Sequence, residues 1–335
     1  MRELAWVLAV VTLVTVVVAW VQDLWPPWAS YAYLGVLVAF IGIPTWVVER
    51  WRKVTVVEAG MVFGCWWRSL GWALGAAFMV LVPYALGHHF WRVEVDGHRA
   101  EWSWSHYSRW PEAAGVQGAA EGLGAGEVRV MAEGEWLWLR WRGPFAEQGQ
   151  LLVRSSGGVR AARVQGARLV DHGGEVHLSS LGMAGGGTLE VRGDAVEVDG
   201  VGGVRLWDGE GLVEGLRWRR SAWWLVQMLL TQLLLVALPE EYFYRGYVQP
   251  TLARRWDGGI GVGRWRLSWA VLLTSAIFAL GHVVVDARLE RLAVFFPSLA
   301  FGWLRERSGG LWAPLVFHGL CNVWVELLGV HYFVS

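Results

Sequence analysis

Cysteine is nearly absent from this sequence. Cys65 and Cys321 are the only two among 335 residues, and they stand in different hydrophobic regions. Neither a disulfide framework nor a cysteine-based metal site can be built from such a pair. Net charge is absent as well, because 29 basic residues balance 29 acidic ones. The composition therefore gives no reason to expect a nucleic-acid partner.

Several catalytic signatures are also missing. The sequence has no HExxH zinc motif, no GxSxG nucleophile elbow, no rhomboid-like serine motif and no YD and GxGD aspartate pair. Ser298, in FPSLAFG, lacks the flanking pattern of a serine nucleophile. The glycine cluster DGGIGVG at 257–263 fits neither a phosphate-binding nor a dinucleotide-binding loop. We interpret it as a connection between helices.

Long uncharged runs are what the sequence has in abundance. Hydrophobic residues make up 55% of the chain, and several runs approach the roughly 20 residues that a spanning helix needs. The pattern predicts an integral membrane protein with about seven transmembrane helices. The sixth run is short, which favours a tilted or re-entrant segment. The seven runs cover residues 4–21, 31–48, 69–87, 221–239, 267–285, 292–304 and 311–330.

Tryptophans gather near the ends of these runs, as they do in the aromatic belts of membrane proteins. The first run lacks a cleavage site, so we expect a retained anchor rather than a signal peptide. The clustered tryptophans are Trp20, Trp25, Trp28, Trp46, Trp51, Trp66, Trp67, Trp223, Trp224 and Trp312.

Basic residues beside the runs predict the orientation. The stretches 49–53, 254–266 and 305–307 would share the cytoplasmic side if the N-terminus is inside. The basic stretch RWRR at 217–220 argues against this orientation. We expect the N-terminus inside and the segment between the third and fourth runs on the extracytoplasmic side, in a bacterial inner membrane.

Residues 92–218 have a different composition, rich in glycine and in short alternating apolar and polar stretches. Such spacing is typical of an all-β sandwich or a small β-solenoid. We therefore predict three domains: transmembrane helices over 1–91, a soluble β insert over 92–218 and a second transmembrane domain over 219–335. The predicted strands are 128–132, 136–141, 150–154, 175–181, 188–193, 195–200 and 204–209.

Charged side chains interrupt the fourth run at LPEEYFYRGY, residues 238–247. Glu241 and Arg245 are four residues apart and can pair on one helix face. Glu240 points about 100° away from its neighbour and has no obvious countercharge. Charged residues inside a membrane are costly, at about 2.5–3.5 kcal/mol at the bilayer centre, and they usually carry function.

Two further polar pairs follow in later runs. Phe278 and His282 stand at i and i+4 in FALGH, and His318 and Asn322 stand at i and i+4 in HGLCN. A lone membrane histidine is often a packing residue, but a carboxylate, two imidazoles and an amide from three apolar runs are hard to explain as structure. They can meet only if the helix from 221 continues to about residue 253. We therefore predict one helix of some thirty residues, bent at Pro239.

These motifs, EExxxR, FxxxH and HxxxN in this order, resemble the CAAX-protease and bacteriocin-processing family of intramembrane proteases, also called CPBP or ABI. The resemblance covers about residues 221–330 and leaves the first three runs and the β insert unexplained. It implies peptide-bond hydrolysis within the membrane, on a protein or peptide substrate with a membrane-embedded or membrane-proximal, C-terminal segment. Membrane lipids are the other expected partners.

The resemblance also implies roles for single residues. Glu240 would be the general base, and His282 would hold and polarise the water. His318 and Asn322 would donate hydrogen bonds to the oxyanion. The residues that orient the site would be Glu241, Arg245 and Phe278.

Three alternatives remain open. Glu240, His282 and His318 could instead hold Zn²⁺, although we favour a mechanism without a cofactor. A catalytically inactive binding or immunity protein of the same fold would be expected to have lost a motif, whereas all three are intact. A proton-coupled transporter would predict internal repeats, which the runs do not show.

Overall fold

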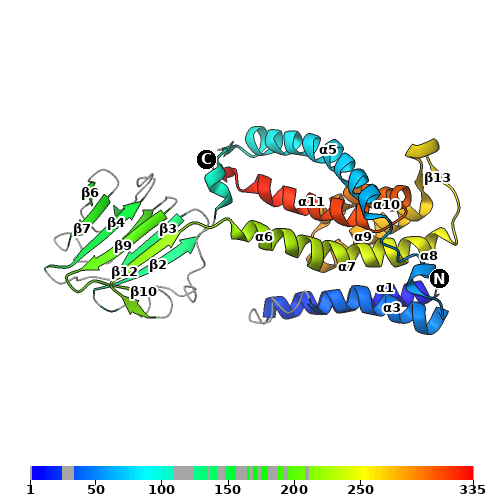
Figure 1. Cartoon of the computed structure of the whole chain (residues 1–335), viewed down its shortest axis with the longest axis horizontal. Coiled ribbons are helices and arrows are strands. Elements are labelled where there is room, and N and C mark those ends of the chain that lie inside the picture. Colours follow the sequence, from blue (N-terminus) through cyan, green and yellow to red (C-terminus); the bar gives the residue numbers. More distant parts are fainter. Residues whose placement is uncertain are drawn as a thin grey trace. The chain divides into compact units, whose positions relative to one another are not determined.

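The computed structural model describes residues 2–24, 34–100, 102–108, 124, 126–133, 136–141, 148–155, 164–165, 169–171, 175–179, 187–191, 195–207 and 211–334. The chain divides into a helical unit, Met1–Ala100 with Gln227–Ser335, and a β unit, Glu101–Val226 (Figure 1). Trp25 and Trp28, assigned above to the aromatic belt, lie outside the described residues.

The helical unit is built from long, mostly apolar helices. A capping box between Thr55 and Glu58 begins α4, and the Ser268 hydroxyl accepts the Val271 N–H to begin α9. The helices are α1 (Arg2–Leu24), α3 (Ile43–Val47), α4 (Val56–Ala59), α5 (Trp66–Phe90), α6 (Trp223–Leu230), α7 (Leu238–Glu241), α8 (Gln249–Ala253), α9 (Trp269–Asp286), α10 (Phe295–Ser308) and α11 (Trp312–Gly329).

Short non-α helical segments connect or extend these helices. Two two-stranded sheets, β1 with β15 and β13 with β14, complete this unit. The π-helical segments are Val38–Gly42, Val48–Arg52, Trp91–Val95, Thr231–Ala237 and Tyr242–Val248, and the 3₁₀ segments are Trp104–Tyr107 in the β unit and Gly263–Trp265 and Leu289–Val294 in the helical unit. The strands are β1 (His98–Ala100), β13 (Gly259–Ile260), β14 (Leu267–Ser268) and β15 (Tyr332–Val334).

Among the described residues, four helices are long and apolar enough to cross a membrane: Arg2–Trp20, Leu34–Arg52, Trp66–Val95 and Trp223–Ala253. The prediction of about seven spans is not confirmed. The apolar part of α9 is shorter, α10 ends in charged side chains, and α11 contains the polar residues of the HxxxN motif. Length therefore separates α9 and α10 from the four longer helices.

The fourth span is one continuous helix of 31 residues, Trp223–Ala253, so the predicted long helix is confirmed. It alternates α-helical and π-helical segments on both sides of Pro239. Proline has no N–H to give to the preceding turn, and the Leu238 N–H next to it bonds the Leu233 carbonyl five residues back. The chain therefore passes Pro239 without ending the helix.

Two apolar clusters hold the helical unit together, and one of them includes this helix. One joins it to the first two spans and to α9, around Phe40, Phe243 and Phe278. The other joins α5, α10 and α11, around Phe301 and Phe317. Gly319 permits a close approach of α11 to the long helix, because a Cβ there would overlap Leu233. The clusters hold the charged segment of the long helix between three other helices.

The β unit is a two-sheet sandwich. One sheet has the order β11-β10-β2-β3-β8-β5 and the other β12-β9-β4-β7-β6, and inward-facing residues of both contribute to one core. All described pairs are antiparallel except β10 with β2. The strands are β2 (Glu127–Glu133), β3 (Trp136–Trp141), β4 (Gln150–Ser155), β5 (Val164–Gln165), β6 (Leu169–Asp171), β7 (Glu175–Ser179), β8 (Gly187–Val191), β9 (Ala195–Val201), β10 (Arg205–Trp207), β11 (Leu212–Val213) and β12 (Gly215–Arg219).

The β-rich middle of the chain confirms the expected insert, and each of the seven predicted strands overlaps an observed one. The sandwich, rather than the solenoid, is the observed arrangement. The predicted strand residues 180–181, 192–193 and 208–209 lie outside the described residues. The alternation of apolar and polar residues predicted these strands because strands such as β9 bury every second side chain.

The sandwich core gives a test of the β unit. Leu139 in β3 is fully buried, so Leu139→Ala should destabilise this unit by about 2–5 kcal/mol, because it removes apolar contacts and leaves a cavity. Hydrogen exchange of the full-length protein should then be faster in β2, β3 and β4 and unchanged in α5 and α11. Arg217→Ala, at a side chain that is 83% exposed, is the control and should change stability by at most about 0.5 kcal/mol. Unchanged exchange in Leu139→Ala would contradict the assigned core.

Candidate active site

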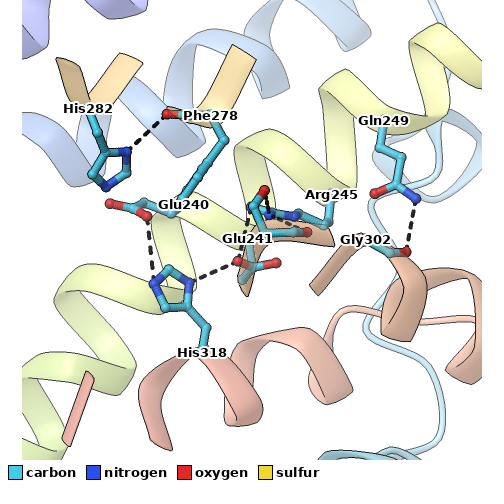
Figure 2. A network of polar contacts seen from close by, with 9 residues as sticks. Glu240, Glu241, Arg245, Gln249, Phe278, His282, Gly302 and His318 are labelled. Carbon is cyan, nitrogen blue, oxygen red and sulfur yellow. Dashed lines mark hydrogen bonds and ion pairs between the residues drawn. The ribbon is translucent and has the colours of Figure 1, made fainter. Parts of the chain in front are cut away.

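The two adjacent carboxylates of α7 occupy different surroundings. The side chain of Glu241 is 0% exposed, and that of Glu240 is 18% exposed. Neighbours on a helix point about 100° apart, so one carboxylate faces Arg245 on its own helix and the other faces away (Figure 2). Glu240 and Glu241 therefore differ in exposure and in the direction of their carboxylates.

Glu241 belongs to a buried ion pair. Its Oε1 lies 3.2 Å from the Arg245 guanidinium, and both side chains are 0% exposed. Arg245 also donates to the Ser298 hydroxyl at 2.6 Å and to the Ser298 carbonyl at 3.2 Å. A buried charge is tolerated only when it is paired and hydrogen-bonded. The pairing predicted from the i, i+4 spacing is therefore present, and Ser298 extends it to α10.

Aromatic rings enclose the arginine. The guanidinium carbon of Arg245 lies 4.7 Å from the ring centre of Phe278 and 5.1 Å from that of Phe301. Cations favour the faces of aromatic rings, particularly where water is excluded. Phe278, predicted from the FxxxH motif to orient the site, thus packs against the ion pair and is itself 2% exposed.

His318 connects the two carboxylates. Its Nδ1 donates to Glu241 Oε1 at 2.9 Å, which directs Nε2 toward Glu240 Oε2 at 3.8 Å. The imidazole stacks on Phe301 with ring centres 4.5 Å apart. A ring held by a hydrogen bond on one nitrogen and by stacking on its face has a fixed orientation.

His282 approaches Glu240 from α9. Its Nδ1 lies 3.0 Å from the Phe278 carbonyl oxygen, and because a carbonyl oxygen only accepts, Nδ1 must carry the proton. In the neutral ring Nε2 then keeps its lone pair. Figure 2 shows this ring and the Glu240 carboxylate pointing toward one another.

Glu240 is left as the carboxylate with unused capacity. Its Oε2 is buried and has no hydrogen-bond partner in the part of the chain that the structure describes. It lies between imidazoles from α9 and α11 (Figure 2). A buried polar atom without a partner is costly, and an oxygen in these surroundings suits a bound water or a substrate group.

Asn322 is placed differently from the other predicted catalytic residues. It lies one turn beyond His318 on α11, and its Nδ2 donates to Gln232 Oε1 at 2.9 Å. The structure brings Glu240, His282 and His318 together, whereas Asn322 contacts a residue eight positions before Glu240 on the long helix. The second N–H of its amide is not used by this hydrogen bond.

Sequence reasoning missed four neighbours of the site. Ser298 was considered only as a nucleophile, and Phe301, Gln232 and Gln249 were not considered. The detectable signal was polarity: Ser298 is the only polar residue of the run 292–304, and Gln232 follows Thr231 inside the apolar run 221–239. Gln249 donates to the Gly302 carbonyl at 3.1 Å and so connects the long helix to α10.

The donor atoms of the three side chains bear on whether they could hold a metal ion. Glu240, His282 and His318 are the set proposed above for Zn²⁺, but no group of three His, Cys, Asp or Glu side chains among the described residues is arranged to hold a metal ion. His318 Nε2 and Glu240 Oε2 are 3.8 Å apart. Two donor atoms that share one tetrahedral Zn²⁺ lie about 3.3 Å apart, so this distance does not decide between the two mechanisms, and we derive no step through a metal.

A comparison with known protein families identifies this region. Residues 222–324 match the family model described as type II CAAX prenyl endopeptidase Rce1-like. This segment is an Rce1-like domain. It contains the carboxylates, the arginine, both histidines and Asn322, and the resemblance to the CAAX-protease family is confirmed. No curated protein matches the chain, and neither does any solved structure.

The match supports a protease function of the type II CAAX endopeptidase kind for the Rce1-like domain. Together with the apolar helices it also supports an integral membrane protein. The chain outside residues 222–324, including the first three spans and the strands of the β unit, lies beyond the match.

The ion pair of the Rce1-like domain gives a second test. Arg245→Met would leave the Glu241 carboxylate buried without its cation, so we expect a loss of stability of about 3–5 kcal/mol, measured by thermal unfolding in detergent. The control is Arg217→Met, which removes an exposed ion pair with Glu197 at 3.4 Å and should cost at most about 1 kcal/mol. Equal losses in the two variants would show that the buried pair does not hold the helices together.

Proposed function

We propose that the Rce1-like domain is an intramembrane endopeptidase in which Glu240 activates the attacking water. The contrast between the two adjacent carboxylates carries this proposal. Oε1 of the fully buried Glu241 is committed to Arg245 and His318, whereas the Glu240 side chain is 18% exposed and lies between two imidazoles (Figure 2). A positioned carboxylate that is not consumed by an ion pair is suited to accept a proton from water.

In the proposed reaction, a water molecule beside Glu240 gives one proton to the carboxylate while its oxygen attacks the carbonyl carbon of the scissile peptide bond. The lone pair on His282 Nε2 accepts a hydrogen bond from the second O–H of the water and so orients its oxygen. The proton on Glu240 then passes to the leaving nitrogen as the carbon–nitrogen bond breaks. The carboxylate is regenerated, and the products are a carboxylic acid and an amine.

The oxyanion would be stabilised from α11. Asn322 has one N–H beyond the one it gives to Gln232, and His318 can donate from Nε2 when its ring is protonated. Hydrogen-bond donors are most effective where water is excluded. Glu241, Arg245 and Phe278 would act indirectly, by holding His318 and the long helix in place.

Zn²⁺ held by Glu240, His282 and His318 is the alternative way to activate water. Metal analysis of the purified protein, together with the chelator sensitivity of cleavage, separates the two mechanisms. Cleavage that survives complete chelation supports activation by the carboxylate. Stoichiometric zinc and a loss of cleavage that zinc restores would favour the metal.

The substrate we propose is a protein or peptide with a membrane-embedded or membrane-proximal C-terminal segment. We further propose a bacterial inner-membrane location, with the N-terminus inside and the β unit outside. The basic stretches at 49–53, 254–266 and 305–307 support this orientation. In this arrangement the β unit would meet substrates at the outer surface of the membrane.

Removing the proposed base is the central test. Glu240→Gln should lower cleavage by about 10²–10⁴-fold, because general-base catalysis contributes that much, without lowering thermal stability. Comparative proteomics of cells with the native protein or the variant would reveal proteins whose C-termini differ. The control is Glu326→Gln, which replaces an exposed carboxylate on α11 and should leave those C-termini unchanged.

Two results would overturn the assignment. Identical C-termini in native and Glu240→Gln cells would favour an inactive binding or immunity protein. Ion flux in proteoliposomes that disappears in Glu240→Gln, without peptide cleavage, would favour the proton-coupled transporter.

The β unit can be tested separately, because its strands enclose their own core. Replacing residues 102–219 by a short flexible linker keeps the pairing of β1 with β15 and the long helix. If the β unit holds substrates, this deletion should lower processing of the substrates found above while leaving the thermal stability of the helical unit unchanged. Unchanged processing would exclude the substrate-holding role.

A further inference from the structure

A cavity lies away from the candidate active site. It has a volume of about 390 Å³, and its lining residues come from the C-terminal end of α8, the hairpin of β13 and β14, and the last turns of α10. Its charged lining residues are Asp257, Arg266, Glu306 and Arg307. The cavity thus presents two positive and two negative side chains to one small space.

These four charges do not neutralise one another. Among the described residues, no ion pair joins either arginine to either carboxylate. Glu306 instead accepts hydrogen bonds from Ser268 at 2.6 Å and Gln249 at 3.4 Å. Arg307 donates to the Gly263 carbonyl at 3.4 Å, and its buried Nε has no partner in this part of the structure. Both signs of charge remain available to a ligand.

The surroundings of the cavity are those of a membrane interface. It opens between the end of the fourth span at Ala253 and the start of the apolar helix at Trp269. Ile260, Val262 and Trp265, in the same hairpin, are 60%, 87% and 65% exposed. Exposed apolar residues next to tryptophan and arginine are typical of segments that lie at the level of lipid head groups.

We propose that this cavity binds the zwitterionic head group of phosphatidylethanolamine. The phosphate would lie on Arg266 and Arg307, because guanidinium groups match phosphate oxygens in geometry and charge. The primary ammonium would lie on Asp257 and Glu306, which can accept its three N–H donors. The acyl chains would pass along Ile260 and Val262.

Two other common head groups fit these charges less well. The trimethylammonium of phosphatidylcholine has no N–H to give to the carboxylates. Phosphatidylglycerol has a phosphate but no cation, so Asp257 and Glu306 would stay unmatched beside an anion. The proposal is independent of the proteolytic function, since no residue of the candidate active site lines the cavity.

Native mass spectrometry of the full-length protein in detergent tests this site. The protein is titrated with phosphatidylethanolamine, phosphatidylcholine and phosphatidylglycerol of identical acyl chains, and with water-soluble glycerophosphoethanolamine. We expect phosphatidylethanolamine to bind about tenfold more tightly than the other two lipids, which corresponds to about 1.4 kcal/mol, and the soluble compound to bind more weakly than the lipid.

Variants connect this preference to the cavity. Asp257→Asn should bring phosphatidylethanolamine close to phosphatidylcholine, and Arg266→Gln with Arg307→Gln should weaken binding of all three lipids. Arg217→Gln with Glu197→Gln removes an exposed pair in the β unit and should change nothing. Thermal unfolding of each variant without lipid shows whether the fold is intact.

Four outcomes would overturn the proposal. Equal binding of phosphatidylethanolamine and phosphatidylcholine would show that the ammonium is not recognised. Tightest binding of phosphatidylglycerol would indicate a site for anionic head groups. Equal binding of the lipid and glycerophosphoethanolamine would indicate a soluble ligand. A preference for phosphatidylethanolamine that survives in folded Asp257→Asn would place the lipid elsewhere.

Discussion

The buried ion pair between Glu241 and Arg245 is the interaction on which the helical core depends. Each charge alone would be costly inside a membrane, and the two are stabilised by each other and by hydrogen bonds from neighbouring helices. Ser298 from α10 accepts from Arg245, and His318 from α11 donates to Glu241. Because one ion pair makes hydrogen bonds to both neighbours, it holds the long helix, α10 and α11 at the same depth.

This arrangement leaves Glu240 as the remaining carboxylate. Because Arg245 and His318 hold Glu241, the adjacent residue is directed toward His282 instead (Figure 2). The structural and the proposed catalytic carboxylate are neighbours in sequence, yet packing separates their roles. A single acid at this place could not both stabilise the helices and remain free to take a proton.

Local spacing predicted much of this site. The i, i+4 rule identified the pair of Glu241 and Arg245, and the need for a common depth predicted a helix that continues past Pro239. Period-two alternation predicted the strands of the β unit. Contacts between segments far apart in sequence could not be predicted, because spacing says nothing about tertiary partners: Ser298 beside Arg245 and Gln232 beside Asn322 are examples. The number of spans is not confirmed, since four helices among the described residues are long and apolar enough to cross a membrane, and hydropathy alone cannot distinguish a spanning helix from a shorter helix buried among others.

The first two spans lie outside the family match, yet they contact the helix that carries the site. Thr45 hydrogen-bonds the Tyr242 hydroxyl at 2.9 Å, and Glu3 accepts from the Tyr247 hydroxyl at 2.7 Å and from Arg52 at 2.8 Å. Adjacent carboxylates point about 100° apart, so the rotation of this helix about its axis decides which of them meets the histidines. Hydrogen bonds to two tyrosines on that helix resist such rotation. The N-terminal spans are therefore part of what orients Glu240, although no residue of theirs lies among the groups proposed to react.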